Sequence, residues 1–248
     1  MRFIRLFLLG LVVAAGLVAT ALFPLIGEPS RKALQRVWCR AALAALGVRL
    51  EVEGEASADC ELLVANHVSW LDVVALSAVR PDVFVCKQEI AAWPVIGRLL
   101  RGTGTHFMRR GSARAAYRTM RELSMRLAIG EQIAVFPEGT TSSGADVLPF
   151  RTALLQSALN AHCPIRPVAL AYTSEAAVYT GDTRFVDSLW AVAGVPALRV
   201  RVALLPRIAS TGIARRHAAA LAREAILSRI RHENIVVPSH LAPTLRPA

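Results

Sequence analysis

The chain begins with a long apolar segment and then changes to alternating short patterns. From Leu6 to Gly27 there are twenty-two residues without a charge, rich in Leu, Val and Ala. A helix of about this length spans the roughly 30 Å hydrocarbon core of a bilayer. A cleavable signal peptide would also follow basic residues, here Arg2 and Arg5, but its apolar core would be only about 7–15 residues long. The pattern favours a retained membrane helix over a signal peptide or a buried soluble helix, since every face is apolar.

A second helical segment is expected over residues 30–47, and its character is different. Four cations are interleaved with apolar side chains there, namely Arg31, Lys32, Arg36 and Arg40. One interpretation is an amphipathic helix lying at a membrane interface, with its cations at the phosphate headgroups. The other is an ordinary amphipathic helix packed on the following domain. Cations are more numerous after the apolar segment than before it, which favours a cytoplasmic location for the rest of the chain.

After Gly47, strand-like and helix-like patterns alternate. Strands are expected at 48–53, 61–65, 83–87, 105–109, 132–136, 165–172 and 198–205, and helices at 69–80, 112–129, 151–161 and 212–231. Such alternation predicts a single α/β domain with a mixed, largely parallel sheet flanked by helices. We therefore divide the chain into a membrane-associated part (1–47), one α/β domain (48–237) and an irregular, proline-containing tail (238–248). Functional sites in such sheets gather at loops beyond the strand ends.

Charge adds information about partners. The formal net charge is +11, and the hydrophobic and charged fractions are 54% and 19%. A surplus of this kind suits nucleic acid, an anionic bilayer or anionic substrates. Aromatic residues make up only 6% of the chain and no nucleic-acid reader motif is present, so nucleic-acid binding is not expected.

The four cysteines are Cys39, Cys60, Cys86 and Cys163. They are far apart in the sequence, with no Cys-x-x-Cys pair and no histidine at zinc-ligand spacing. We therefore expect no metal site, and four isolated, reduced thiols in a protein that faces the cytosol.

The segment from Glu61 to Asp72 is the first candidate for chemistry. An apolar strand ends at Asn66, His67 follows, and Ser69 with Asp72 forms a Ser-x-x-Asp capping box at the start of a helix. Because His67 precedes the cap and Asp72 lies in the first turn, the chain can fold the imidazole back over the carboxylate. A neutral imidazole oriented by a carboxylate is a general base for a hydroxyl nucleophile. The alternative is that Asp72 merely caps the helix and His67 is a loop residue.

Two further segments carry candidate binding residues. A strand ends at Pro137 and is followed by a turn of Glu138, Gly139 and Thr140, where glycine permits close backbone approach and open amides, and Glu138 could bind substrate hydroxyls. Arg109 and Arg110 end another strand, and a guanidinium there could bind a phosphate through two parallel hydrogen bonds. An ordinary turn and solvent-facing charge are the alternatives.

The order of these blocks is more specific than any one of them. Asn-His-Val-Ser-Trp-Leu-Asp, Lys-x-Glu, Phe-Met-Arg-Arg, Phe-Pro-Glu-Gly-Thr and Cys-Pro-Ile-Arg-Pro-Val occur in this order between residues 60 and 170. This arrangement resembles the lysophosphatidate (1-acyl-glycerol-3-phosphate) acyltransferase family. The resemblance implies that His67 is the base and Asp72 its partner. It also implies that Arg110, with Arg109 sharing the task, holds the acceptor's phosphate, that Glu138, Gly139 and Thr140 bind the acceptor, and that Pro167 lies in a block associated with the acyl donor.

The resemblance also implies partners and a location. The donor would be acyl-CoA or acyl-carrier protein, the acceptor a lysolipid, and the place the cytoplasmic face of the inner membrane, with no metal or other cofactor. One departure concerns the acceptor: many phosphatidate-forming members continue after Phe-Pro-Glu-Gly-Thr with Arg-Ser, whereas this chain has Thr141 and Ser142. That continuation resembles the branch that acylates lyso-ornithine lipid. A non-catalytic protein that binds anionic membranes through its basic helices is a further alternative.

Overall fold

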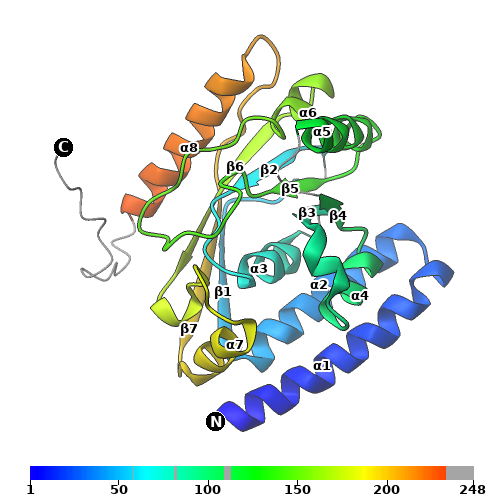
Figure 1. Cartoon of the computed structure of the whole chain (residues 1–248), viewed down its shortest axis with the longest axis vertical. Helices are drawn as coiled ribbons and strands as arrows, with labels where there is room; N and C mark the ends of the chain where they lie inside the picture. Colours follow the sequence, from blue (N-terminus) through cyan, green and yellow to red (C-terminus); the bar gives the residue numbers. More distant parts are fainter. Residues whose placement is uncertain (58, 81–82, 109–112, 233–248) are drawn as a thin grey trace.

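A seven-stranded sheet organises the chain (Figure 1), and the computed structural model describes residues 1–57, 59–80, 83–108 and 113–232. The strand order is β1-β7-β6-β2-β5-β3-β4, and every neighbouring pair is parallel except β6 with β7. The mixed, largely parallel sheet predicted from the sequence is therefore confirmed. The strands are β1 (Val48–Glu53), β2 (Leu62–Ala65), β3 (Val83–Lys87), β4 (His106–Met108), β5 (Ile133–Val135), β6 (Ile165–Tyr172) and β7 (Leu198–Leu204).

Helices cover both faces of this sheet (Figure 1). Side chains alternate along β2, so Leu63 packs with α2, α3 and α7 on one face, while Leu62 and Val64 pack with α5, α6 and α8 on the other. All four residues of β2 are buried, as expected for a strand covered on both faces. The helices are α1 (Arg2–Leu22), α2 (Glu28–Ala45), α3 (Leu71–Val79), α4 (Ile96–Gly102), α5 (Ala113–Ala128), α6 (Gln156–Asn160), α7 (Phe185–Gly194) and α8 (Arg215–His232).

The N-terminal helix α1 forms an extra layer outside α2 (Figure 1). It is docked along its length on the domain. Near its start, the Arg5 guanidinium donates to the carbonyls of Ala193 and Val195 at the C-terminal end of α7. Near its middle, Trp38 of α2 donates from Nε1 to the Val12 carbonyl at 2.7 Å. The Trp38 ring lies where a Cβ at Gly16 would be, 2.4 Å from Nε1, so only glycine fits at that crossing.

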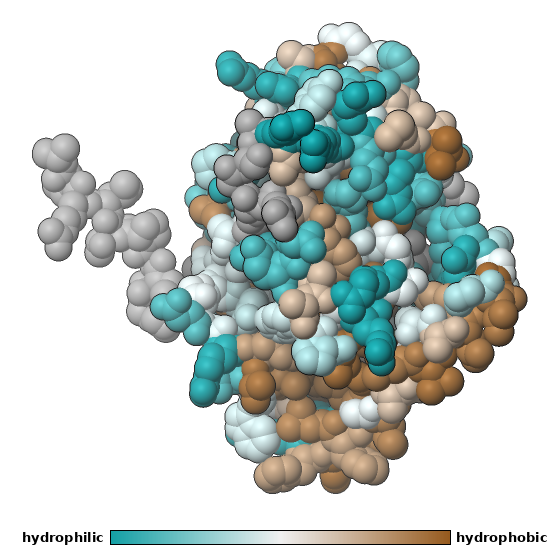
Figure 2. Space-filling model, turned by 45° about the vertical axis from the view of Figure 1, so that its right-hand side comes forward, coloured by the Kyte–Doolittle hydropathy of each residue, from teal (hydrophilic) through white to brown (hydrophobic). Residues whose placement is uncertain are grey.

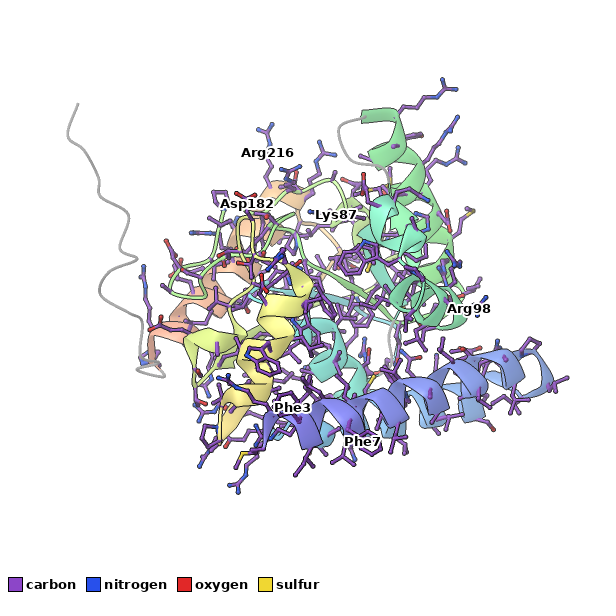
Figure 3. All side chains as sticks on the ribbon, turned by 60° about the horizontal axis from the view of Figure 1, so that its bottom comes forward. Phe3, Phe7, Lys87, Arg98, Asp182 and Arg216 are labelled. Carbon is purple, nitrogen blue, oxygen red and sulfur yellow. A yellow bond between two sulfur atoms is a disulfide. The ribbon has the colours of Figure 1, made fainter. Side chains whose placement is uncertain are left out.

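The side of α1 that faces away from the sheet is apolar and exposed. Phe7 and Val18 are 67% and 63% exposed, and Phe3 and Phe7 lie at the border of the molecule (Figure 3). Figure 2 shows hydrophobic side chains gathered over this part of the surface. By length and composition, Arg2–Leu25 could cross a membrane, as the sequence predicted.

The second helix packs on the following domain, which is one of the two arrangements expected for it. Helix α2 lies against α3 and β1, and Leu43 and Leu46 are almost fully buried in the core. Its Arg40 donates from Nε to the Ala78 carbonyl at the end of α3. This helix therefore packs on the domain and supports α1.

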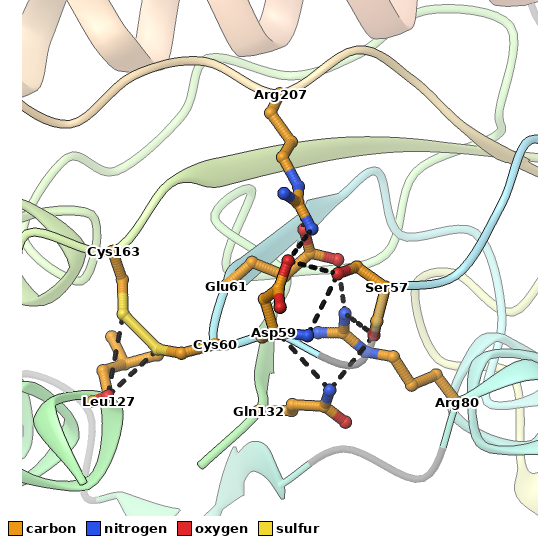
Figure 4. The surroundings of a disulfide bond; sticks show 9 residues. All are labelled: Ser57, Asp59, Cys60, Glu61, Arg80, Leu127, Gln132, Cys163 and Arg207. Atoms are coloured by element: carbon orange, nitrogen blue, oxygen red, sulfur yellow. Dashed lines mark hydrogen bonds and ion pairs between the residues drawn. A yellow bond between two sulfur atoms is a disulfide. The ribbon is translucent and has the colours of Figure 1, made fainter. Parts of the chain in front are cut away.

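The expectation of four isolated thiols was wrong for one pair. Cys60 and Cys163 form a disulfide across 103 residues of sequence (Figure 4). The sheet explains why: Leu62 of β2 pairs with Ile165 of β6, and each cysteine stands two residues before its strand residue. A register between parallel strands cannot be read from cysteine spacing alone. Cys39 and Cys86 are not part of a disulfide.

A buried charge cluster lies beside this disulfide (Figure 4). Glu61 is fully buried and accepts hydrogen bonds from the guanidinium groups of Arg80, Arg166 and Arg207. A buried carboxylate needs such partners, because desolvation otherwise penalises its charge. The cluster therefore fastens the loops at the starts of β2 and β6, at the sheet edge opposite to the one that carries His67.

Candidate active site

The candidate catalytic residues lie where neighbouring strands end. His67 follows β2, Tyr172 ends β6, and Phe136 follows β5, and these three strands are adjacent in the sheet. The carboxyl ends of parallel strands meet at one edge, which is where sites form in open α/β sheets. Asn66 extends the ladder beyond β2: its side-chain amide exchanges hydrogen bonds with both the N–H and the carbonyl of Leu170 in β6. His67 therefore starts from a fixed backbone position.

The predicted contact between the imidazole and the carboxylate is present. His67 Nδ1 lies 2.8 Å from Asp72 Oδ2. The ring stacks on Phe136 with centroids 4.1 Å apart, and that contact fixes its plane. The His67 side chain is 20% exposed, whereas Asp72 is fully buried. Within the described residues, Nε2 of His67 has no hydrogen-bond partner, so this nitrogen is left for a substrate.

Asp72 is held by four donors. Oδ2 accepts from the amides of Val68 and Ser69, at 2.7 and 2.9 Å, as well as from His67. Oδ1 accepts from the Tyr172 hydroxyl at 2.5 Å. The predicted capping box is thus half present: Asp72 reaches back to the Ser69 amide, but Ser69 Oγ accepts from Leu71 instead of Asp72. The helix begins two residues later than predicted, at Leu71.

Tyr172 is a site residue that the sequence analysis missed. Burial, followed by the neighbouring charge of Asp72, raises its pKa well above the usual value, so the phenol stays protonated and serves as a hydrogen-bond donor. A polar hydroxyl at the end of a predicted apolar strand, Ile165–Tyr172, was the available signal.

The structure places the Glu138 carboxylate against two backbone amides. Its Oε1 accepts from the His67 amide at 2.6 Å and its Oε2 from the Leu148 amide at 2.9 Å, and only 4% of the residue is exposed. Both oxygens are therefore occupied within the protein, and this geometry gives no support to a direct contact with substrate hydroxyls. Burial raises the pKa of Glu138, an effect that the two amide hydrogen bonds oppose.

The turn after Glu138 encloses the backbone of His67. Ser142 donates its amide hydrogen to the His67 carbonyl at 2.7 Å. Gly139 has a φ of +75°, in the left-handed region that favours glycine, and its amide bonds to the Phe136 carbonyl. Within the described residues, the amides of Thr140 and Thr141 have no hydrogen-bond partner. The open amides expected in this turn are thus those of these two residues.

The remaining predicted residues are placed as follows. Arg109 and Arg110 lie outside the described residues. Thr140 is exposed at the surface of the turn. Pro167 is buried inside β6, opposite Val64, and its carbonyl accepts from the Leu205 amide. Within the described ranges, no three His, Cys, Asp or Glu side chains gather closely enough to hold a metal ion.

Several known proteins are similar to this chain in sequence. Residues 49–171 match the acyltransferase family model. The chain is 41% identical over 170 residues to a 1-acyl-sn-glycerol-3-phosphate acyltransferase from Neisseria meningitidis serogroup B, covering 66% of this chain and 67% of that protein. It is 36% identical over 203 residues to a lyso-ornithine lipid O-acyltransferase from Pseudomonas aeruginosa, covering 80% and 78% respectively.

One solved structure has the same fold. The crystal structure of a 1-acyl-sn-glycerophosphate acyltransferase from Thermotoga maritima superposes with a TM-score of 0.69 over 96% of this chain and 99% of that one, at 20% identity. The protein is an acyltransferase. It belongs to the acyltransferase family that includes lysophosphatidate acyltransferases and lyso-ornithine lipid acyltransferases. The alternative of a non-catalytic membrane-binding protein is therefore set aside.

Proposed function

We propose that the chain moves a fatty acyl group from the thioester of acyl-CoA or acyl-carrier protein to the free hydroxyl of lysophosphatidate. The observation that carries this proposal is the His67–Asp72 pair. One imidazole nitrogen is held by a buried carboxylate, and the other is left for a substrate at the edge of the sheet. That arrangement supplies a base for an alcohol acceptor.

In the proposed reaction, the acceptor hydroxyl lies against Nε2 of His67. As its oxygen attacks the thioester carbonyl carbon, the hydroxyl proton passes to Nε2, while Nδ1–H remains bonded to Asp72. The carbon–sulfur bond of the tetrahedral intermediate then breaks, and the leaving thiolate takes the proton back from the imidazolium. No protein nucleophile, metal or cofactor is needed, because the acceptor's own oxygen forms the new ester.

The surrounding contacts prepare the imidazole for this step. Glu138 fixes the His67 amide, Ser142 fixes its carbonyl, and Phe136 stacks on its ring. Because both the backbone and the ring plane are held, little reorganisation is required when charge develops. We assign Glu138 to this positioning of His67, while the amides of Thr140 and Thr141 are the candidates for binding a negative charge.

Lyso-ornithine lipid is a second candidate acceptor. Two observations favour it: Thr141 stands where many phosphatidate-forming members have arginine, and a lyso-ornithine lipid acyltransferase aligns with 80% of this chain. The chemistry at His67 would be the same, because both acceptors offer a free hydroxyl.

The surface of α1 supports work at a membrane. Its exposed apolar face adjoins Val186 and Trp190 of α7, and Phe3 packs edge-on against Trp190. Arg5 and Trp38 hold α1 against the domain. The exposed apolar face of α1 therefore runs along the side of the molecule, away from the domain. We infer that α1 lies in one leaflet with the domain beside it, so that a lipid acceptor need not leave the bilayer surface.

The test is a direct comparison of acceptors with the purified chain. Lysophosphatidate and lyso-ornithine lipid are each offered in mixed micelles with acyl-CoA or acyl-carrier protein as donor, and the products are measured by mass spectrometry. The proposal expects a higher kcat/KM with lysophosphatidate. A preference for lyso-ornithine lipid would select the second candidate, and no product with either acceptor would refute both.

A further inference from the structure

A cationic side chain lies at the turn next to His67 without an assigned task. It belongs to Arg151, eleven residues beyond Thr140 in the sequence, and its side chain is exposed. A Cβ at Gly139 would stand 2.8 Å from Nε of Arg151, so the guanidinium is packed directly on this glycine. The Arg151 amide also donates to the Pro137 carbonyl at 2.8 Å. Both contacts hold this arginine at the Glu138–Ser142 turn.

The turn places Arg151 at the edge of the sheet that carries His67. Val64 of β2 pairs with Val135 of β5, so the residues that follow the two strands, His67 and Glu138, stand at the same level. Glu138 and Ser142, which flank Gly139 in the sequence, both hydrogen-bond to the His67 backbone. Arg151 therefore packs on the centre of the segment that holds the candidate base.

The charge of Arg151 is not used within the protein. In the part of the chain that the structure describes, its guanidinium has no hydrogen bond or ion pair. The nearest carboxylate in the turn, that of Glu138, already accepts two amides. The amides of Thr140 and Thr141 also lack partners in these residues. A guanidinium packed on Gly139, followed in the chain by two amides without partners, is suited to bind an anion, since both donor types prefer negatively charged oxygen.

We propose that Arg151, with the amides of Thr140 and Thr141, binds the anionic headgroup of the acceptor lipid. The inference rests on the proposed function, because it assigns this group to the acceptor that reacts at His67. Arg151 would supply the positive charge missing at Thr141 in the sequence. A guanidinium can meet a phosphate through two parallel hydrogen bonds, whereas an ammonium can offer only a point charge.

The first test uses acceptors with different headgroups, including a pair that differs only in the phosphate. Wild type, Arg151→Ala and Arg151→Lys are assayed with lysophosphatidate, with lyso-ornithine lipid and with monoacylglycerol, which lacks the phosphate. We expect Arg151→Ala to raise KM for lysophosphatidate at least tenfold with little change in kcat, and to leave monoacylglycerol unaffected. Arg151→Lys should recover part of the loss. A larger KM change in Arg151→Ala with lysophosphatidate than with lyso-ornithine lipid identifies the bound anion as a phosphate. The reverse order identifies it as a carboxylate.

Arg216 provides a matched control. It is exposed in the first turn of α8, which follows the bridge between Ile208 and Ile165 at the start of β6. His67 lies five residues beyond Leu62, which pairs with Ile165, so it stands roughly 17 Å from that bridge along the strand direction. Like Arg151→Ala, Arg216→Ala removes the positive charge of one exposed arginine. It should leave the KM for lysophosphatidate unchanged (Figure 3 labels Arg216).

A second measurement does not depend on turnover. Glycerol 3-phosphate, the soluble headgroup, is titrated into wild type, Arg151→Ala and Gly139→Ala and its binding is followed by ligand-observed NMR. Gly139→Ala would force the guanidinium away and strain a φ of +75°. We expect both variants to lose binding. Equal binding by wild type and Arg151→Ala, or a KM change confined to the acyl donor, would overturn the inference even if acyl transfer at His67 is confirmed.

Discussion

Tyr172 and His67 approach Asp72 from different strands and bind different oxygens of its carboxylate. The Tyr172 hydroxyl donates to Oδ1 at 2.5 Å, and His67 Nδ1 bonds to Oδ2 at 2.8 Å. The carboxylate is thereby fixed against rotation, with its charge directed at the imidazole. A residue 100 positions away in the sequence thus orients the candidate base through its partner.

Replacing this tyrosine gives the first prediction. Tyr172→Phe leaves a buried carboxylate oxygen without its donor, so we expect a loss of about 1–3 kcal/mol in the free energy of unfolding. Because Tyr172 acts through Asp72 and not on the substrate, kcat should fall roughly tenfold with KM unchanged. Denaturant unfolding and steady-state kinetics measure the two effects. Tyr117→Phe, on the exposed face of α5, is the control, and an unchanged kcat in Tyr172→Phe would contradict the positioning role.

Glu138 gives a pH-dependent prediction. Burial raises its pKa above 4.5, so the folded protein binds this proton more readily than the unfolded chain does. Its contribution to stability is therefore full at low pH and is lost as the pH rises from 4.5 through the raised pKa. We expect the unfolding free energy of wild type minus that of Glu138→Gln to decrease as the pH rises across that window. Denaturant unfolding at several pH values tests this, with exposed Glu55→Gln as control. A difference that grows with pH would contradict a raised pKa for Glu138.

The disulfide gives a prediction about stability and about compartment. Cys60→Ser should lower the free energy of unfolding by about 2–4 kcal/mol under non-reducing conditions. After reduction, wild type and variant should have the same free energy of unfolding. Thiol titration of unfolded wild type should find two reactive thiols, those of Cys39 and Cys86, and four after reduction. Reduced Cys60 and Cys163 in cells would support the expected cytoplasmic location, and a disulfide there would place the domain on the oxidising side.

The free face of α1 gives a prediction about membrane binding. Phe7→Lys and Leu11→Lys place charge on the exposed apolar side of the helix without removing the Arg5 or Trp38 contacts. We expect these variants to lose cosedimentation with anionic lipid vesicles, while turnover of a micellar short-chain acceptor is kept. Leu221→Lys makes the same change on the partly exposed surface of α8 and should bind as wild type does. Undiminished sedimentation of Phe7→Lys would contradict the interfacial arrangement.

Local patterns predicted most of the sheet. The bounds expected for β1, β3 and β6 agree with the structure, because short runs that alternate (β1) or are mostly apolar (β3 and β6) between turn residues are strong signals. Helix α7 was missed: its ten residues include Phe, Val and Trp, which are common in strands, and no side chain caps its start. The two-residue difference at the start of α3 follows from Asp72, whose carboxylate bonds to the turn before the helix.

Contacts between distant segments could not be predicted. The sequence showed that His67 and Asp72 could meet, since they are only five positions apart. It did not show that Tyr172 would reach Asp72, that Cys60 would face Cys163, or that Arg151 would return to Gly139. Each of these depends on strand order and register, which arise from packing of the whole sheet.

The central claim is that His67 is the base that activates the acceptor hydroxyl. The most direct measurement compares single-turnover acyl transfer to lysophosphatidate by purified wild type and His67→Ala, with folding of both checked by circular dichroism and thermal unfolding. We expect His67→Ala to keep its fold and to lose activity by about 10²–10⁴-fold. Transfer by folded His67→Ala at the wild-type rate would contradict the account.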